Sequence, residues 1–269
     1  MLVLNFGYNS SMTRLKESKL NFLMTESPSG EVLTSNWFNQ HGISNKLVWW
    51  YVHSNWLERL ASEAYKKVGD HVNWAGAIAA LQHQLKLPIH VASITALQLL
   101  GIGHFVTMGG FKYVTLFSDE FVKTPKWFFN ANLWNVTFKL RTIKLFNEKP
   151  AQSLVTKNIE GVDLTISSPE LAILELLYLT PNKQPFDEAV LIMEKLTTLR
   201  PGLVQLLLEQ CLSFKVKRIF LSLSERFYHP WLSELDFNKF DLGRGKRMIG
   251  SGGHYDSKYQ ISMPKILEG

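Results

Sequence analysis

A chain of 269 residues with 46% hydrophobic side chains can bury a core in one large or two modest domains. The net charge of +6 favours acidic partners, and the single cysteine, Cys211, excludes an internal disulfide framework and fits a reducing compartment. No uncharged apolar run is long enough to cross a bilayer, and Met1–Leu4 is too short for a signal peptide, so we expect a cytoplasmic protein without membrane contact.

The first predicted element is a helix at residues 12–24, where apolar side chains recur at helical spacing before turn residues at 25–30. A short second helix follows, with Thr34 or Ser35 as its cap. Gly42 ends that helix, because glycine adopts the left-handed conformation without strain.

Ser44 then caps a further helix at residues 45–55. Residues 57–60 and 64–68 predict two strands around a turn at 62–63. A helix-turn-helix places its second helix in the major groove, and a wing strand touches the flanking backbone. We therefore predict that residues 1–87 are a winged helix-turn-helix domain that binds double-stranded DNA; the alternative is a small helical domain with an ordinary solvated surface. The candidate DNA-binding residues are Ser44, Asn45, Lys46, Trp49, Trp50, His53, Lys66 and Lys67.

A helix at residues 73–85 precedes Pro88, where we place the domain boundary. The remaining part, residues 88–269, predicts a larger mixed α/β domain whose strands gather in its middle, so the fold class is α+β. Its predicted helices cover 91–100, 171–179, 186–198, 201–212, 216–227 and 231–236. Its predicted strands cover 104–108, 112–117, 135–146, 162–166 and 255–264.

Motifs of catalysis are absent from the sequence. The loop at 243–247 lacks the first glycine of a phosphate-binding loop, and Arg247 stands where magnesium needs a hydroxyl. Asp256 could belong to a nucleotidyltransferase, but Lys258 stands where a second metal-binding carboxylate would be needed. We expect no enzyme, no catalytic residue, no metal and no cofactor.

Several segments, in combination and in order along nearly the whole chain, resemble the AbiEi-type antitoxin and transcriptional regulator family of type IV toxin–antitoxin (abortive infection) systems. The resemblance implies a DNA-binding repressor that binds operator inverted repeats of its own operon. It also implies that residues 88–269 are an antitoxin domain against a nucleotidyltransferase-type toxin, without a stable complex between the two proteins. The segments that carry it are 42–44, 69–70, 166–177, 196–201, 216–221, 225–226, 229–231, 241–247, 252–253 and 258–264.

We place the antitoxin surface in the C-terminal segment, residues 214–269, because it holds ten Lys or Arg against six Asp or Glu. Cations at a helix start oppose the helix dipole, so they are not explained by helix stability. A basic glycine-rich loop suits an anion; the alternative is a solvated surface that keeps the domain soluble. The candidate residues are Lys215, Lys217, Arg218, Arg244, Lys246, Arg247 and Lys258.

Two features of the DNA-binding surface keep other functions open. Trp49 and Trp50 cannot make the bidentate hydrogen bonds that recognise guanine, and Glu63 in the wing turn repels phosphate. The second hypothesis is therefore a protein-interaction module whose winged helix no longer binds DNA, with at least one of the two tryptophans covered by the second domain or another chain. A third hypothesis, an enzyme acting on a nucleotide, lacks its carboxylate pair.

Overall fold

The computed structural model describes residues 18–103, 110–250 and 253–265. These residues form helices and three separate sheets, which confirms the predicted α+β class. The chain forms two compact units. Unit 1 contains residues 1–87, 123–135 and 158–164, and unit 2 contains 88–122, 136–157 and 165–269. Along the chain, unit 1 first gives way to unit 2 at Pro88. The division of the chain into domains 1–87 and 88–269 stays a prediction.

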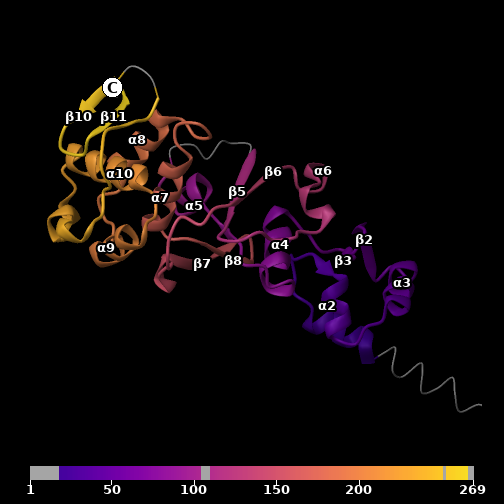
Figure 1. Ribbon diagram of the computed structural model, residues 1–269. Helices are drawn as coiled ribbons and strands as arrows, with labels where there is room; N and C mark the ends of the chain where they lie inside the picture. Colours follow the sequence, from indigo (N-terminus) through magenta and orange to yellow (C-terminus); the bar gives the residue numbers. More distant parts are fainter. Residues whose placement is uncertain (1–17, 104–109, 251–252, 266–269) are drawn as a thin grey trace, which may run out of the picture. The chain divides into compact units, whose positions relative to one another are not determined.

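In the described part of unit 1, residues 18–26 are helical, and α2 (Ser35–Gln40) and α3 (Asn45–His53) follow (Figure 1). The helix predicted at 12–24 is thus confirmed from residue 18 on, and its first part lies outside the described residues. The side chain of Thr34 accepts a hydrogen bond from a backbone N–H in the first turn of α2, and Ser44 does the same for α3. Both helices therefore begin where the sequence predicts, because each has an oxygen for its unpaired N–H groups.

The turn between α2 and α3 is set by Gly42, whose φ of +66° is the left-handed conformation predicted for it. Ile43 follows and is fully buried. The apolar sides of the helices meet the hairpin in one core, so the turn and the core fix the direction of α3 together. This core contains Leu23, Leu33, Trp37, Phe38, Ile43, Val48, Tyr51 and Leu57.

A three-stranded sheet completes this part of unit 1. Strands β1 (Leu33–Thr34), β2 (Leu57–Ala61) and β3 (Ala64–Lys67) are arranged in the order β1-β3-β2, and all neighbours are antiparallel. The β2–β3 hairpin is the one predicted from the sequence. Its turn residue Glu63 has a φ of +64°.

Unit 1 also contains further short helices. Asn73 caps α4 (Trp74–Ala79), whose chain continues as one π-helical stretch, η1 (Ala80–Gln84). Together they match the predicted helix at 73–85. The short helices η2 (Lys126–Phe129) and α6 (Ala131–Trp134), which the sequence analysis did not predict, also belong to unit 1.

The central sheet has the order β6-β5-β4-β8-β7. Its strands are β4 (His90–Val91), β5 (Tyr113–Ser118), β6 (Thr137–Thr142), β7 (Leu154–Ile159) and β8 (Val162–Ser167). β5 and β6 are parallel, as are β4 and β8, whereas β4 and β5 are antiparallel. The sequence analysis missed β4 and β7. The strand predicted at 104–108 lies outside the described residues.

The helices of unit 2 pack around α7, which contacts α5, α8, α9 and α10 (Figure 1). Helix α7 is almost entirely buried, as its apolar sequence predicts. The segment predicted as a helix at 231–236 is instead a 3₁₀ turn, η4 (Pro230–Glu234). The five helices are α5 (Ser93–Leu99), α7 (Pro169–Leu179), α8 (Phe186–Lys195), α9 (Pro201–Gln210) and α10 (Phe214–Arg226).

The buried carboxylate of Glu175 joins α7 to the sheet. It lies 2.7 Å from Nε2 of His90 on β4. It also accepts hydrogen bonds from the backbone N–H of Ser93 and from the hydroxyl of Ser167. A buried carboxylate needs such partners to offset its lost hydration. Glu175 therefore holds α7 and the strands in register.

The C-terminal sheet corrects two predictions. Residues 255–264 form not one strand but two, β10 (Gly253–Asp256) and β11 (Ile261–Pro264), with β9 (Arg247–Met248) parallel to β11. The Asp256 side chain accepts hydrogen bonds from backbone N–H groups two and three residues further on, which closes the hairpin turn. The strands of the second part are therefore not confined to its middle.

Candidate nucleic-acid interface

Helix α3 has one buried side and one exposed side. Val48 and Tyr51 are buried in the core of unit 1. Burial raises the pKa of Tyr51 to about 12, so this phenol stays neutral at physiological pH. The hydroxyl of Ser44 is occupied by the cap, because it accepts a hydrogen bond from the backbone of Leu47 at 3.3 Å. These contacts fix which residues of α3 face solvent.

The exposed side of α3 brings five predicted residues together. Asn45 and Lys46 are exposed in its first turn. Trp49 is 60% exposed and Trp50 is 37% exposed. The Trp49 ring stacks on His53 with 3.7 Å between ring centroids, and His53 Nδ1 lies 2.8 Å from the Trp49 carbonyl oxygen. The surface therefore has a polar end at the start of α3 and an aromatic end.

Lys66 on the wing is held by two groups. Its Nζ lies 3.2 Å from a carboxylate oxygen of Glu58 and donates to the backbone carbonyl of Asp70 at 3.2 Å. Glu58 and Lys66 are directly paired across the β2–β3 hairpin, so their side chains point to the same side of it. Lys66 is therefore at the predicted surface, with part of its charge neutralised.

Lys67 is not at that surface, which corrects the prediction. It is only 9% exposed, because it lies opposite the buried Leu57 and points inward. Its ammonium donates to the Ser27 carbonyl at 3.2 Å and to the Ser29 hydroxyl at 3.3 Å. Lys67 thus links β3 by hydrogen bonds to the loop at Ser27 and Ser29.

Arg59 is a basic residue of the wing that the sequence analysis missed. It is exposed on β2, and its Nε donates to the backbone carbonyl of Ala61 at 3.2 Å. Arg59 lies in a strand that the sequence predicts. The strand pattern alone does not show which of the basic side chains in this hairpin is exposed to solvent. Glu63 is exposed at the tip of the turn, as the sequence predicts.

The start of α10 is less exposed than predicted. Lys215 Nζ donates to the carbonyls of Tyr178 and Thr180, and burial lowers its pKa. Lys217 is 3% exposed, and burial lowers its pKa as well. Lys217 Nζ lies 5.2 Å from the ring centroid of Phe214. Both lysines contribute to the packing of α10 rather than to an open surface.

Arg218 is the clearest correction, because it is only 2% exposed. Burial, together with the nearby charge of Arg247, lowers its pKa. The guanidinium donates four hydrogen bonds of 2.7–3.1 Å to backbone carbonyls, which compensate for its lost hydration. Arg218 thus fixes the glycine-rich loop and the turn between β10 and β11. The four acceptors belong to Leu242, Gly243, Gly245 and Gln260.

The loop itself remains basic and accessible. Arg244, Lys246 and Arg247 are exposed. Lys246 Nζ lies 5.4 Å from the ring centroid of Tyr255, and Lys258 forms an ion pair with Glu225. The structure thus divides the predicted antitoxin residues into an exposed group on the loop and a buried group on α10.

In the described ranges, no three His, Cys, Asp or Glu residues lie close enough to share a metal ion. Over the same ranges, every helix is too short or too polar to cross a bilayer.

Two family models match the chain in sequence. Residues 16–108 match the model described as transcriptional regulator, AbiEi antitoxin N-terminal domain. Residues 112–264 match the model described as transcriptional regulator, AbiEi antitoxin, type IV TA system. The chain belongs to the AbiEi antitoxin family. The predicted resemblance is therefore confirmed, and with it the description of the family as antitoxins and transcriptional regulators of type IV systems.

A solved structure supports the fold of this AbiEi family member. The crystal structure of the RV2827C protein from Mycobacterium tuberculosis is similar with a TM-score of 0.59 and 11% sequence identity. The similarity covers 94% of this chain and 92% of that one, so the two share a fold along most of their length. No curated protein matches the chain in sequence.

Proposed function

We propose that unit 1 is a winged helix-turn-helix module that binds double-stranded DNA at inverted repeats upstream of its own operon and represses that operon. One observation carries the proposal. The first turn of α3 is capped by Ser44 and exposes Asn45 and Lys46. In helix-turn-helix proteins the N-terminal residues of the second helix contact base edges.

Different side chains of unit 1 can contact the bases and the phosphates of DNA. The amide of Asn45 can pair with adenine, and Lys46 can donate to guanine. Arg59 and Lys66 on the wing would contact phosphates, which position a protein on the duplex without specifying sequence. Trp49 and His53 would lie against sugar or the methyl group of thymine, since neither can make a bidentate contact to a base.

The second part of the proposal is neutralisation of a nucleotidyltransferase-type toxin, without a stable complex, in the cytoplasm. The family description supports the antitoxin role, and the exposed loop cations Arg244, Lys246 and Arg247, with Lys258, are the proposed surface. Arg218 supports that surface through its hydrogen bonds to the loop and the turn. We propose no catalytic role for any residue of this regulator.

Electrophoretic mobility shift of the promoter DNA tests the repressor role. The full-length protein should shift its own promoter at low salt, and the affinity should fall steeply as salt rises, because bound Lys and Arg release counterions. A double variant, Asn45→Ala with Lys46→Ala, should bind promoter and unrelated duplex equally. Failure of the wild-type protein to shift its promoter at low salt would overturn the repressor role.

Rescue of cells that express the toxin tests the antitoxin role. Because segments of both units alternate along the chain, the test uses the full-length protein rather than a fragment. A triple variant of Arg244, Lys246 and Arg247 to alanine should fold normally and fail to rescue. The matched control replaces the exposed lysines Lys144, Lys195 and Lys239, which removes the same charge elsewhere in unit 2. Equal rescue by both triple variants would move the antitoxin surface to other residues.

One observation favours the alternative of a protein-interaction module. Trp49, Trp50 and Trp56 are all exposed in unit 1, and exposed aromatic side chains in one region generally mark contacts. A second chain would cover them in this case. Single-tryptophan variants separate the two functions, because DNA should quench Trp49 emission in a repressor. An interaction module should instead show blue-shifted emission that promoter DNA leaves unchanged.

A further inference from the structure

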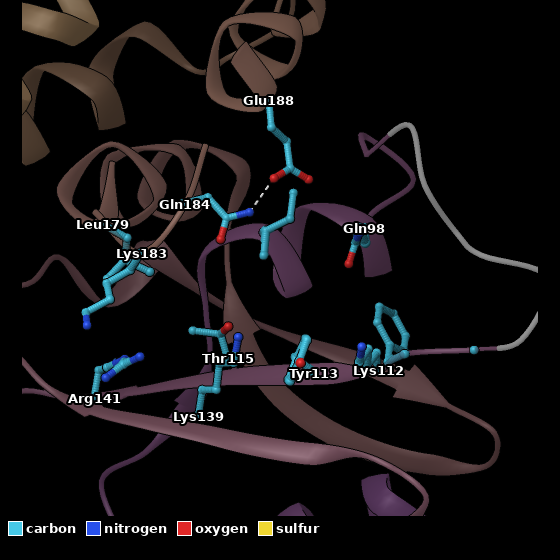
Figure 2. Close-up of a pocket in the computed structure, with 13 residues that line it drawn as sticks. Gln98, Lys112, Tyr113, Thr115, Lys139, Arg141, Leu179, Lys183, Gln184 and Glu188 are labelled. Atoms are coloured by element: carbon cyan, nitrogen blue, oxygen red, sulfur yellow. Dashed lines mark hydrogen bonds between the residues drawn. The ribbon is translucent and has the colours of Figure 1, made fainter. Parts of the chain in front are cut away.

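Unit 2 contains a pocket of about 240 Å³ that no predicted function uses (Figure 2). Its floor is formed by β5 and β6, and its walls come from α5, the end of α7 and the first turn of α8. Figure 2 shows Arg141 and Lys183 at one end of the pocket, and Lys112 with Gln98 at the other. The pocket is distinct from the C-terminal loop, because none of its lining residues comes from 214–269.

The register of the sheet creates the floor of the pocket. In the parallel pair, Thr115 lies opposite Lys139, and Phe117 lies opposite Arg141. Alternate residues of a strand share one face, so Tyr113, Thr115, Lys139 and Arg141 point to the same side of the sheet. Two cations are thereby held on rigid strands beside an aromatic ring.

The pocket has more positive than negative charge. Its one carboxylate, Glu188, accepts a hydrogen bond from Gln184 (Figure 2). None of the four lining cations forms an ion pair with a carboxylate in the part of the chain that the structure describes. These cations are Lys112, Lys139, Arg141 and Lys183.

Cations that gather without counterions repel one another, and an anion in their midst removes that repulsion. Arg218 shows the contrast within the same unit, because its guanidinium donates four hydrogen bonds to backbone carbonyls. Lys139 and Arg141 have no such acceptors among the described residues and are only half-buried, so their donors are available to a ligand. Phosphate oxygens suit such a set of donors.

An aromatic surface lies next to these donors. Tyr113 is 42% exposed, and Lys139 Nζ lies 3.5 Å from its ring centroid. Aromatic side chains stack on nucleobases of any sequence, and a basic groove beside them follows the phosphates. Gln98 and Gln184 add amide groups at the rim that can pair with a base edge.

We propose that this pocket binds a nucleotide, with its phosphates between Lys139, Arg141 and Lys183 and its base against Tyr113. Two sources share this chemistry: a free nucleoside triphosphate and a nucleotide within single-stranded RNA. The inference is independent of DNA binding, because every residue of the pocket belongs to unit 2 whereas the proposed DNA interface belongs to unit 1.

Isothermal titration calorimetry on the full-length protein tests the proposal with defined probes. The probes are ATP, GTP, CTP, UTP, inorganic triphosphate and a 12-nucleotide single-stranded RNA, each at low salt. We expect saturable binding of at least one nucleotide probe. Binding of triphosphates identifies free nucleotides as the source, and binding of the RNA alone identifies a chain. Absence of saturable binding for all the nucleotide and RNA probes would overturn the proposal.

Substitutions of the pocket cations test whether nucleotides bind in this pocket. Arg141→Gln and Lys183→Ala should each weaken nucleotide binding about tenfold, since each removes a charge-assisted contact. Lys183 is exposed, so its variant tests the pocket even if the strand variant loses stability. The matched control is Lys144→Ala, which removes the same charge from an exposed residue of unit 2 outside the pocket. Equal weakening by the control would show diffuse charge and refute the assignment.

Tyr113 separates a nucleotide from a simple phosphate site. Tyr113→Leu should weaken the binding of nucleotides roughly tenfold and leave the binding of inorganic triphosphate unchanged, because only a nucleotide has a base that can stack on the ring. Tyr113→Phe keeps the ring and should bind as the wild type does. If Tyr113→Leu binds nucleotides normally, the pocket holds phosphate without recognising a base, and the proposal fails. None of these variants should alter the shift of promoter DNA.

Discussion

Basic residues follow a serine cap at the start of both α3 and α10, but they are exposed in α3 and largely buried in α10. Lys46 lies exposed in the first turn of α3 in unit 1. Arg218 lies near the start of α10 in unit 2, yet it is buried and donates to four carbonyls. Both residues follow a serine-capped helix start. Where other segments place hydrogen-bond acceptors around such a basic residue, it stabilises the fold from inside. Where they do not, its side chain stays exposed and can bind a ligand.

The largest expected effect comes from removing the internal support. Arg218→Ala leaves four carbonyls of the glycine-rich loop and the following turn without their donor. Each hydrogen bond to a charged group contributes about 1.5–3 kcal/mol, and part of the loss is recovered by water. We expect a decrease of about 3–5 kcal/mol in the free energy of unfolding, measured by urea denaturation.

Arg244→Ala is the matched control for this prediction, because Arg244 is exposed in the same loop. Its substitution should change the free energy of unfolding by less than about 0.5 kcal/mol. Similar stability of the two variants would contradict the contrast between buried and exposed cations. It would return Arg218 to the predicted antitoxin surface.

The next largest effect on stability is expected at Glu170, a buried carboxylate that is paired with Arg200. Burial raises the pKa of this carboxyl, but its hydrogen bonds with Arg200 outweigh burial and lower the pKa to about 2. Arg200 Nε and Nη2 lie 2.9 Å from the two carboxylate oxygens, and its backbone N–H donates to one of them at 3.0 Å. The charged form is therefore favoured in the folded protein.

The sign of the pH dependence follows from this lowered pKa. The stabilisation is complete above the unfolded pKa of 4.5 and disappears as the pH falls to about 2. It amounts to about 3–4 kcal/mol, since each pKa unit corresponds to about 1.4 kcal/mol. Denaturation of Glu170→Gln between pH 5 and 2 should show a flatter decline than the wild type. Glu194→Gln, at an exposed position of α8, should decline as the wild type does. A wild-type slope in Glu170→Gln would refute the assignment.

The parts of the fold that the sequence predicted well depend on local chemistry. Thr34, Gly42 and Ser44 determine the limits of α2 and α3 through caps and a left-handed turn within a few residues. The strand pattern of residues 57–67 similarly predicted the β2–β3 hairpin. Such signals need only neighbours in the sequence, so they can be recognised without knowing the fold.

The parts that failed depend on distant segments. Val91 was assigned to a helix, but it forms a strand because it pairs with Leu116 and Ile166. The sequence predicts Lys67 and Arg218 at surfaces, but the acceptors of Lys67 lie 38 and 40 residues away and those of Arg218 lie 24–42 residues away. The nucleotide pocket was missed for the same reason, because the register of β5 against β6 brings its cations together.

A smaller effect concerns Lys46, an exposed cation of α3, and its neighbour Asn45. Asn45→Ala and Lys46→Ala should each reduce the preference for promoter over unrelated duplex by about 1–3 kcal/mol per lost base contact. Both residues are exposed, so neither variant should unfold at a lower urea concentration. Competition binding with labelled promoter measures the preference. Retention of the full preference in both variants would remove α3 from the base-contacting role.

The smallest effect compares two cations of the wing. Arg59→Ala should lower the dependence of log affinity on log salt by about one unit, because one phosphate contact is lost. Lys67→Ala should leave that dependence unchanged and lower the stability of unit 1, since its ammonium bonds to the loop at Ser27 and Ser29. Filter binding at several salt concentrations, with urea denaturation of each variant, measures both quantities. A changed salt dependence in Lys67→Ala, with unchanged stability, would mean that Lys67 reaches DNA and that its inward orientation does not persist in the complex.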